Sequence, residues 1–170
     1  SFVATGAGTT DSGYNWALTG SPSAGLNVGV GAGSEKATND GASSKDASFS
    51  TGFVTYALAG ATVGLQMSDA SGGAKGAIGN KVLIAGVSYS VNENLAVSFS
   101  KMENEYANGN TLRSTVNAPK ADVVEDTTGI GASYTMGSAA VRVLASQGEN
   151  IGGTQGNNTD HIEVSLMLAF

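Results

Sequence analysis

The sequence of 170 residues contains no cysteine, two prolines and one histidine. Without cysteine it can form neither a disulfide nor a thiolate metal site. The sequence has eight lysines and arginines and fourteen aspartates and glutamates, which gives a formal net charge of −6. This negative charge argues against general nucleic-acid binding. No run approaches the roughly 18 to 20 apolar residues of a membrane-spanning helix. No signal-peptide pattern opens the chain, so we expect any secretion signal to be removed or to lie outside this sequence.

Glycine, in contrast, is abundant, with 25 residues, or about twice its usual share. These glycines lack the three-residue period of collagen, and a patterned hydrophobic content of 41% argues against disorder. The pattern has a period of two, which is typical of β-strands and not of helices. In the last segment Ile162, Val164, Leu166, Leu168 and Phe170 point one way, and the residues between them point the other way.

The alternation predicts nine strands that are joined by short and long connections in strict alternation. The expected strands lie at about 12–19, 25–34, 48–58, 61–69, 80–91, 95–103, 126–136, 139–148 and 159–170, with a possible tenth in the opening segment 1–8. Short turns are expected at 20–24, 59–60, 92–94 and 137–138, and long polar segments at 35–47, 70–79, 104–125 and 149–158. This rhythm favours one up-and-down antiparallel unit over residues 1–170, because a solenoid or propeller would keep a more constant period.

Two environments fit the alternation. In a soluble sandwich or small barrel the apolar face points inward, whereas in a membrane barrel it points outward to lipid around a wet interior. The other face here carries mainly Gly, Ser, Thr, Asn and Gln, and most charges lie in the long connections. A soluble protein would carry more lysine and glutamate on its solvent face. We therefore predict an all-β, antiparallel up-and-down transmembrane β-barrel, whose strands cross the hydrocarbon with about nine to eleven residues each.

Aromatic residues recur at one position relative to the expected short turns. Trp16, Tyr56, Tyr89 and Tyr134 each precede a small residue, an apolar residue and a turn. An aromatic girdle at the headgroup level of a membrane has this placement. We predict that these four rings and Phe170 form such a girdle, that the short turns face the periplasm and that the long loops face outward. The alternative is a soluble β-protein whose tyrosines happen to end strands.

Three features of the chain point to one family. They are the C-terminal strand "HIEVSLMLAF", the strands "GVGAGSE", "GIGASYTM" and "AGVSYSV", and the rhythm of turns and loops. Together they resemble the general diffusion porins of Gram-negative outer membranes. The resemblance implies a barrel of about sixteen strands, assembled as a homotrimer and in contact with lipid and lipopolysaccharide.

The chain supplies only nine or ten strands of such a barrel. It therefore looks like the C-terminal portion of a porin, with about 120 to 180 further residues upstream at ~20 residues per strand and loop. The constriction loop of the family lies in the N-terminal half and has no candidate here. A complete ten-stranded barrel is the alternative if segment 1–8 forms a true first strand.

Five polar residues of the expected strands are candidates for the pore lining. Arg142 alternates with valines, and we expect it to face the lumen because a charge on the lipid face costs about 2 to 4 kcal/mol near the midplane. His161 and Glu163 share one face of the last strand. Asn27 and Gln66 lie on the polar side of their strands. The three ionisable residues are expected to bias ion passage, and a local ion pair that only stabilises the wall is the alternative.

No constellation typical of an enzyme is present. The repeated Gly-x-Gly pairs are not followed by the helix of a nucleotide-binding fingerprint. The single histidine has no identifiable nucleophile or catalytic partner, so we expect no catalytic residue and no cofactor. Glu103, Glu105, Glu125 and Asp126 are candidates for loop-bound calcium or for bridging lipopolysaccharide through divalent cations. Simple solvation of these carboxylates is the alternative.

The sequence therefore predicts a non-enzymatic, water-filled channel in the bacterial outer membrane, through which ions and small hydrophilic solutes diffuse passively. The acidic balance favours a mild preference for cations. One alternative function is an adhesin or receptor that acts through loops 35–47 and 104–125, and another is a barrel enzyme. Conductance across a planar bilayer distinguishes the channel from both.

Overall fold

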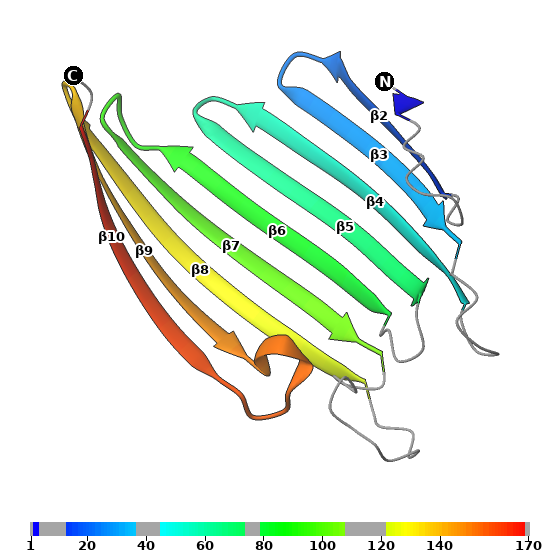
Figure 1. The fold of residues 1–170 in the computed structure, drawn as a ribbon. Helices are drawn as coiled ribbons and strands as arrows, with labels where there is room; N and C mark the ends of the chain where they lie inside the picture. The colour runs from blue at the N-terminus through cyan, green and yellow to red at the C-terminus, as the bar shows by residue number, and fades with distance from the viewer. Residues whose placement is uncertain (1, 4–12, 37–44, 74–78, 108–121, 169–170) are drawn as a thin grey trace.

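The computed structural model describes residues 2–3, 13–36, 45–73, 79–107 and 122–168. These residues form one antiparallel sheet in which every strand lies beside its neighbour in sequence (Figure 1). A two-residue strand, β1 (Phe2–Val3), is followed by nine full strands. The nine are β2 (Gly13–Ser23), β3 (Leu26–Glu35), β4 (Lys45–Leu58), β5 (Ala61–Gly73), β6 (Asn80–Ser90), β7 (Leu95–Tyr106), β8 (Val123–Met136), β9 (Ala139–Glu149) and β10 (Thr159–Leu168). The predicted all-β, up-and-down order of nine strands is confirmed.

Several strands continue further toward the long connections than the sequence pattern predicts. β4 begins at Lys45, β7 ends at Tyr106 and β8 begins at Val123. The apolar alternation stops earlier in each of these strands, where charged residues begin. Backbone hydrogen bonds of a ladder do not depend on side-chain polarity, so the pairing continues into these polar segments.

The short connections between strands are tight turns. Ala59 and Gly60 both have positive φ, 50° and 83°, as a type I′ hairpin turn requires. Gly137 has φ 57° in the turn between β8 and β9, a conformation that glycine adopts without steric cost. In the turn between β6 and β7, the Asn92 side-chain oxygen accepts a hydrogen bond from the Leu95 N–H at 2.9 Å. Local turn chemistry therefore sets the register of these hairpins.

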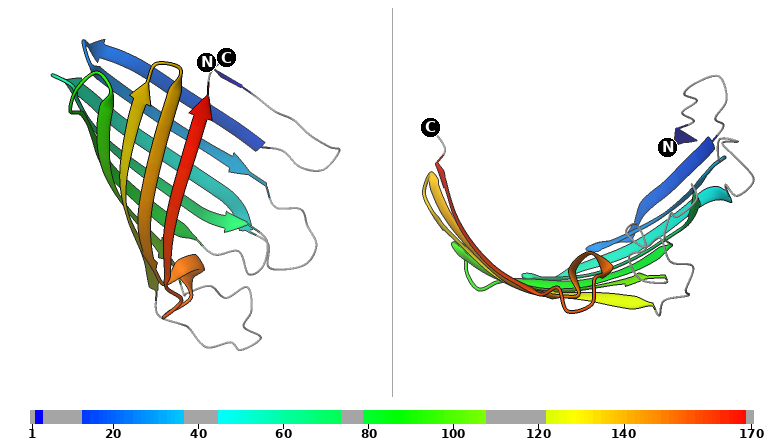
Figure 2. Two further views of the ribbon diagram at one scale, coloured as in Figure 1. Left: turned by 90° about the vertical axis from the view of Figure 1, so that its left-hand side faces the viewer. Right: turned by 60° about the horizontal axis from the view of Figure 1, so that its bottom comes forward.

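The sheet is bent into an open trough (Figure 2). A short 3₁₀ helix, η2 (Ile151–Gly153), follows β9 and lies on the concave side of this trough. Its residues contact Glu125 and Tyr106, so these two side chains belong to the concave face. Directly paired residues of adjacent strands point to the same side of a sheet, and successive residues alternate. The strand register therefore assigns the strand residues to the concave or the convex face.

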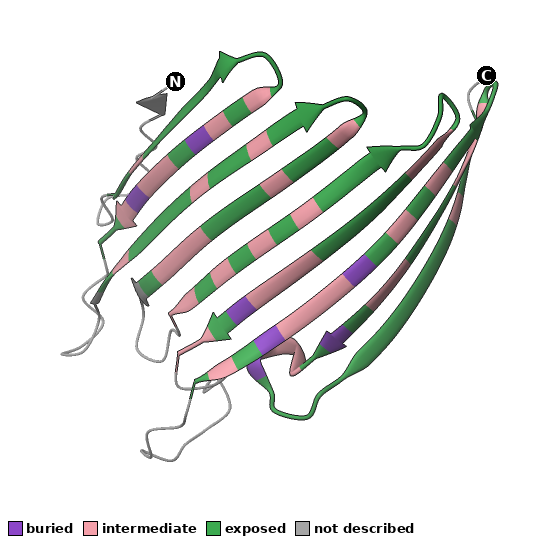
Figure 3. Cartoon of the chain, turned by 180° about the vertical axis from the view of Figure 1, so that it is seen from behind, coloured by how far each residue is buried: buried purple, intermediate pink, exposed green. Residues whose placement is uncertain are grey.

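The described residues contain no buried hydrophobic side chain (Figure 3). Within the described ranges the sheet is a single layer, and only the short η2 lies against one of its faces. Leu166 is 63% exposed and Tyr134 is 42% exposed. The dry core of a soluble sandwich is thus absent from the described part of the chain. Within the described ranges the sheet is also open. There β10 pairs only with β9, and at the other end of the sheet β2 pairs with β3 and with the two-residue β1.

Two phenylalanines of β4 cover glycines of β3 on the concave face. Phe53 is directly paired with Gly29, and Phe49 with Gly33. A Cβ atom added at either glycine would meet the ring of its partner. An aromatic ring over a strand glycine shields backbone that the glycine leaves uncovered, and it helps to fix the register.

Replacing Gly29 with alanine is expected to lower the free energy of unfolding by about 1 to 3 kcal/mol, because the new methyl group displaces the Phe53 ring. Gly86→Ala is the matched control on the same face, since its Cβ would lie 3.5 Å from the nearest atom, an ordinary contact. Urea unfolding followed through Trp16 fluorescence measures both variants. Equal losses would contradict a specific role for the ring packed over Gly29.

Candidate functional site

Small and polar residues cross the concave face in continuous rows toward the short turns. One row is connected pair by pair from β3 to β10 through the strand register. It consists of Asn27, Thr55, Gly64, Gly86, Ser100, Gly129, Ser146 and His161. The next row toward the short turns consists of Ala57, Thr62, Ser88, Ser98, Gly131, Leu144 and Glu163. Hydroxyl and amide groups at this density give the concave face a surface that water can hydrate.

All five residues predicted as pore lining lie on the concave face. Asn27 and His161 are the two ends of one row, and Gln66 lies on β5 between them. Arg142 and Glu163 come from the adjacent strands β9 and β10. The structure therefore brings Arg142, His161 and Glu163 together and leaves Asn27 and Gln66 apart from them. Their role in transport stays a prediction.

The three ionisable residues form a charged stripe along β9 and β10. His161 Nε2 lies 3.8 Å from Glu163 Oε2, and both side chains are 59% exposed. Arg142 is paired directly with Ser165, so Arg142 and Glu163 are diagonal neighbours. Among the described residues Arg142 forms no ion pair. An exposed pair of this kind contributes little to stability.

Larger side chains occupy the concave face toward the long connections. Phe49, Phe53, Ile84 and Met102 all point to this side. In β4 the sequence pattern does not separate the two faces, because the strand carries aromatic residues on both, Phe53 on one and Tyr56 on the other. The concave face is therefore mostly small and polar toward the short turns, with Leu144 and Met167 as exceptions, and mixed toward the long connections.

Glu125 lies on the concave face within β8 and is only 8% exposed. Its Oε2 atom accepts a hydrogen bond from the Tyr106 hydroxyl at 3.0 Å and another from the Gly152 N–H at 3.0 Å. Burial, together with the bond to Glu125, raises the pKa of Tyr106, the last residue of β7, so its hydroxyl stays protonated and can donate. The expectation that Glu125 lies in a loop is wrong, because β8 begins before it. The alternative of simple solvation does not apply to it either, because η2 covers it.

The convex face carries a belt of apolar side chains beside the short turns. One row of this belt runs from β4 to β10 through direct pairs. It consists of Tyr56, Val63, Val87, Phe99, Ile130, Ala145 and Ile162. Between this row and the short turns, the described strands place no charged residue on the convex face. We call this surface the apolar belt.

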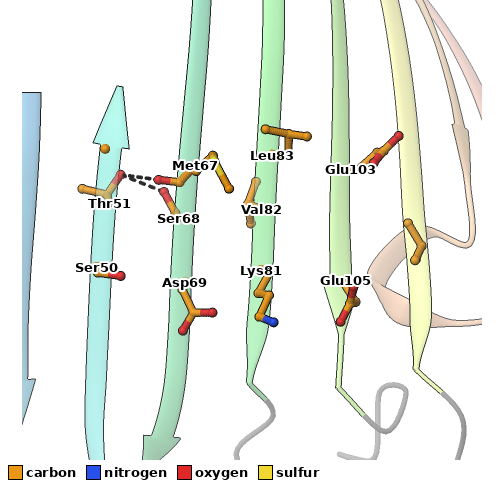
Figure 4. Close-up of a pocket in the computed structure, with 12 residues that line it drawn as sticks. Ser50, Thr51, Met67, Ser68, Asp69, Lys81, Val82, Leu83, Glu103 and Glu105 are labelled. Atoms are coloured by element: carbon orange, nitrogen blue, oxygen red, sulfur yellow. Dashed lines mark hydrogen bonds between the residues drawn. The ribbon is translucent and has the colours of Figure 1, made fainter. Parts of the chain in front are cut away.

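Charged residues lie on the convex face at the opposite end, toward the long connections. Lys101 Nζ forms ion pairs with Glu103 at 3.0 Å and with Asp126 at 2.9 Å. Three further residues lie side by side on β5, β6 and β7, where they line a shallow depression (Figure 4): Asp69, Lys81 and Glu105. Glu103, Glu105 and Asp126 thus belong to strands, not to loops. In the described ranges no group of three or more acidic, histidine or cysteine side chains is arranged to hold a metal ion.

The aromatic residues predicted as a girdle do not all lie at one end of the sheet. Tyr56, Tyr89 and Tyr134 lie on the convex face close to the short turns. Trp16 is also on the convex face but lies toward the long connections, because β2 continues beyond the expected turn across a register irregularity. The expectation that Trp16 precedes a short turn is therefore wrong. Phe170 lies outside the described residues.

No protein-family model and no curated protein matches the chain. Within its described part, no helix combines the length and the apolar character needed to cross a bilayer. The resemblance to porins therefore depends on the residue pattern alone.

Proposed function

We propose that this chain forms part of the wall of a porin-like β-barrel in the bacterial outer membrane. The observation that carries the proposal is a single-layer sheet, without a buried hydrophobic residue in its described ranges, that separates an apolar convex face from a more polar concave face. Contiguous apolar patches above a few hundred Å² mark membrane or protein contacts. In the proposed arrangement lipid covers the apolar belt, and the charged residues above it lie at headgroup level, in contact with lipopolysaccharide.

Closure into a barrel requires an odd number of strands between β10 and β2. Strand direction alternates along the sheet, so β2 and β10 both run from the long connections toward the short turns (Figure 1). Direct pairing of these two edges would be parallel. If β1 supplies the one strand needed, the barrel has ten strands, and seven strands would give the sixteen of the porin resemblance. The wide separation of the two edges in Figure 2 favours the larger barrel.

The proposed activity is passive diffusion of ions and small hydrophilic solutes along the concave face. Water wets the rows of Ser, Thr, Asn and Gly, and solutes cross down their gradient. Within the stripe of Arg142, His161 and Glu163, the guanidinium and the carboxylate supply the fixed charges that bias ion passage. A homotrimer is the assembly that the porin resemblance implies.

Conductance across a planar bilayer tests this proposal directly, with the protein at its native length. Because the chain has no cysteine, a single introduced thiol reports on one position. Ser98 and Val97 are consecutive and point to opposite faces. A charged methanethiosulfonate reagent is expected to lower the conductance of an open Ser98→Cys channel and to leave that of Val97→Cys unchanged.

Each outcome of this experiment has a distinct meaning. A native-length protein that inserts into the bilayer without conducting would refute the channel and favour the adhesin or receptor function. If the reagent lowered the conductance of Val97→Cys but not that of Ser98→Cys, the pore would lie on the convex face and the proposed orientation would be reversed.

A further inference from the structure

Residues 150–158, between β9 and β10, form a compact structure that we call the cap. The Asn150 N–H donates to Asn158 Oδ1 at 3.2 Å, and Asn150 Oδ1 accepts from the Gly156 N–H at 2.9 Å. The Ile151 N–H donates to the carbonyl of Asn157 at 2.8 Å. Most of the polar segment expected at 149–158 is thus a compact structure that satisfies many of its own backbone groups.

The cap is attached to the concave face and does not extend away from the sheet. Gly152 donates its N–H to Glu125 Oε2, and the Tyr106 hydroxyl donates to the same atom. Gly153 has φ 69° and lies against the Tyr106 ring, where a Cβ atom would collide. Asn150 Nδ2 donates to a backbone carbonyl of β8 at 2.9 Å. Two strands and the cap therefore meet at one carboxylate.

A carboxylate is costly to bury unless donors compensate it. Glu125 loses most of its contact with water. One of its hydrogen bonds comes from Tyr106 on β7 and the other from Gly152 in the cap. A connection that only joined β9 to β10 would leave the carboxylate in solvent. The arrangement instead holds the cap in one position, over the end of the concave face where larger side chains such as Met102 already project.

We infer that the cap is a fixed size filter at the long-connection end of the lumen, and that Glu125 is the positioning residue that holds it there. The inference rests on the proposed channel. Solutes passing along the concave face meet the cap at this end, so its position limits their size. Glu125 itself lies beneath η2 and acts on solutes only through the cap.

Hydrogen exchange in the folded, native-length protein tests the attachment without any need for transport. Glu125→Ala is expected to speed exchange of the Gly152 amide about tenfold or more, the effect of losing a hydrogen bond to a charged group. Glu125→Gln keeps an acceptor oxygen and is expected to retain most of the protection. Tyr106→Phe removes the hydroxyl that donates to Glu125 but keeps the bond between Glu125 and Gly152, so it is expected to have a smaller effect than Glu125→Ala. Glu105→Ala, at an exposed carboxylate on the opposite face, is expected to change nothing.

Single-channel recording with polyethylene glycols of increasing size then tests the filter. Glu125→Ala is expected to shift the polymer exclusion limit to larger sizes and to raise the conductance, whereas Glu105→Ala keeps the wild-type values. If Glu125→Ala does not fold, the same comparison is made with Glu125→Gln and Tyr106→Phe, ordered by their exchange rates.

The two measurements separate the filter from the channel. Faster exchange at Gly152 with an unchanged exclusion limit would overturn the filter while leaving the channel intact. Unchanged exchange in Glu125→Ala would overturn the attachment. A wild-type protein that shows a protected Gly152 amide but no conductance would refute the channel, and the filter with it, although the attachment would hold.

Discussion

Replacing Val97 with lysine is expected to lower the free energy of unfolding in lipid vesicles by about 1 to 2 kcal/mol, because the cost of a lysine on the lipid face of a barrel falls from about 2 to 4 kcal/mol at the bilayer midplane to about 0 to 1 kcal/mol at the interface. Val97 is the middle one of the three convex residues that β7 adds to the apolar belt, between Leu95 and Phe99. Its direct partners are Tyr89 and Ala132. An ammonium group at this position has no charged partner within the belt and must give up water.

Ser98→Lys is the matched control, because the residue follows Val97 directly and points to the concave face. In a wet lumen this change is expected to cost less than about 0.5 kcal/mol, as surface substitutions usually do. Urea unfolding of protein refolded into vesicles, followed through Trp16 fluorescence, measures both variants. A larger cost for Ser98→Lys than for Val97→Lys would mean that the convex face is the wet one, and the membrane proposal would fail.

The strand order could be predicted because its signal is local. A period of two is visible within each strand, and the tight turns at 59–60 and 137–138 carry glycine with positive φ. These two signals were sufficient for nine strands, and they also place Arg142, His161 and Glu163 on one face. Whether the sheet closes does not follow from either signal, because closure depends on strands that pair at the edges.

The cap and the position of Trp16 could not be predicted from local pattern. Glu125 follows a long polar segment, and only its contacts with Tyr106 and Gly152 show that it is buried. These contacts join residues far apart in the sequence, which periodicity does not report. For Trp16, the register irregularity between β2 and β3 adds residues before the turn, so the count from ring to turn was misleading. Both errors arise where pairing or packing overrides the alternation.

Replacing Arg142 with glutamate is expected to shift the preference of the channel toward cations by about tenfold. One unit charge about 12 Å from a passing ion in water contributes roughly 0.35 kcal/mol, with opposite sign for a cation and an anion, so its loss changes their ratio by about 0.7 kcal/mol and a charge reversal doubles this. Arg142→Gln, which only neutralises the charge, is then expected to give about a threefold shift. Reversal potentials in a potassium chloride gradient across a planar bilayer measure both, with the protein at its native length.

The shift in reversal potential of variants at other charged residues shows whether the stripe acts on passing ions or whether its side chains only interact with one another. Glu163→Gln is expected to shift the preference toward anions, since it removes a negative charge from the same face. Lys101→Gln removes a cation from the convex face, where its partners Glu103 and Asp126 hold it outside the lumen, and it is expected to leave the reversal potential unchanged. If Arg142→Glu and Lys101→Gln behave alike while the thiol at position 98 still blocks conduction, the pore is real but Arg142 lies outside the ion path. Arg142 would then only form part of the channel wall, and the selectivity of the channel would arise elsewhere on the concave face.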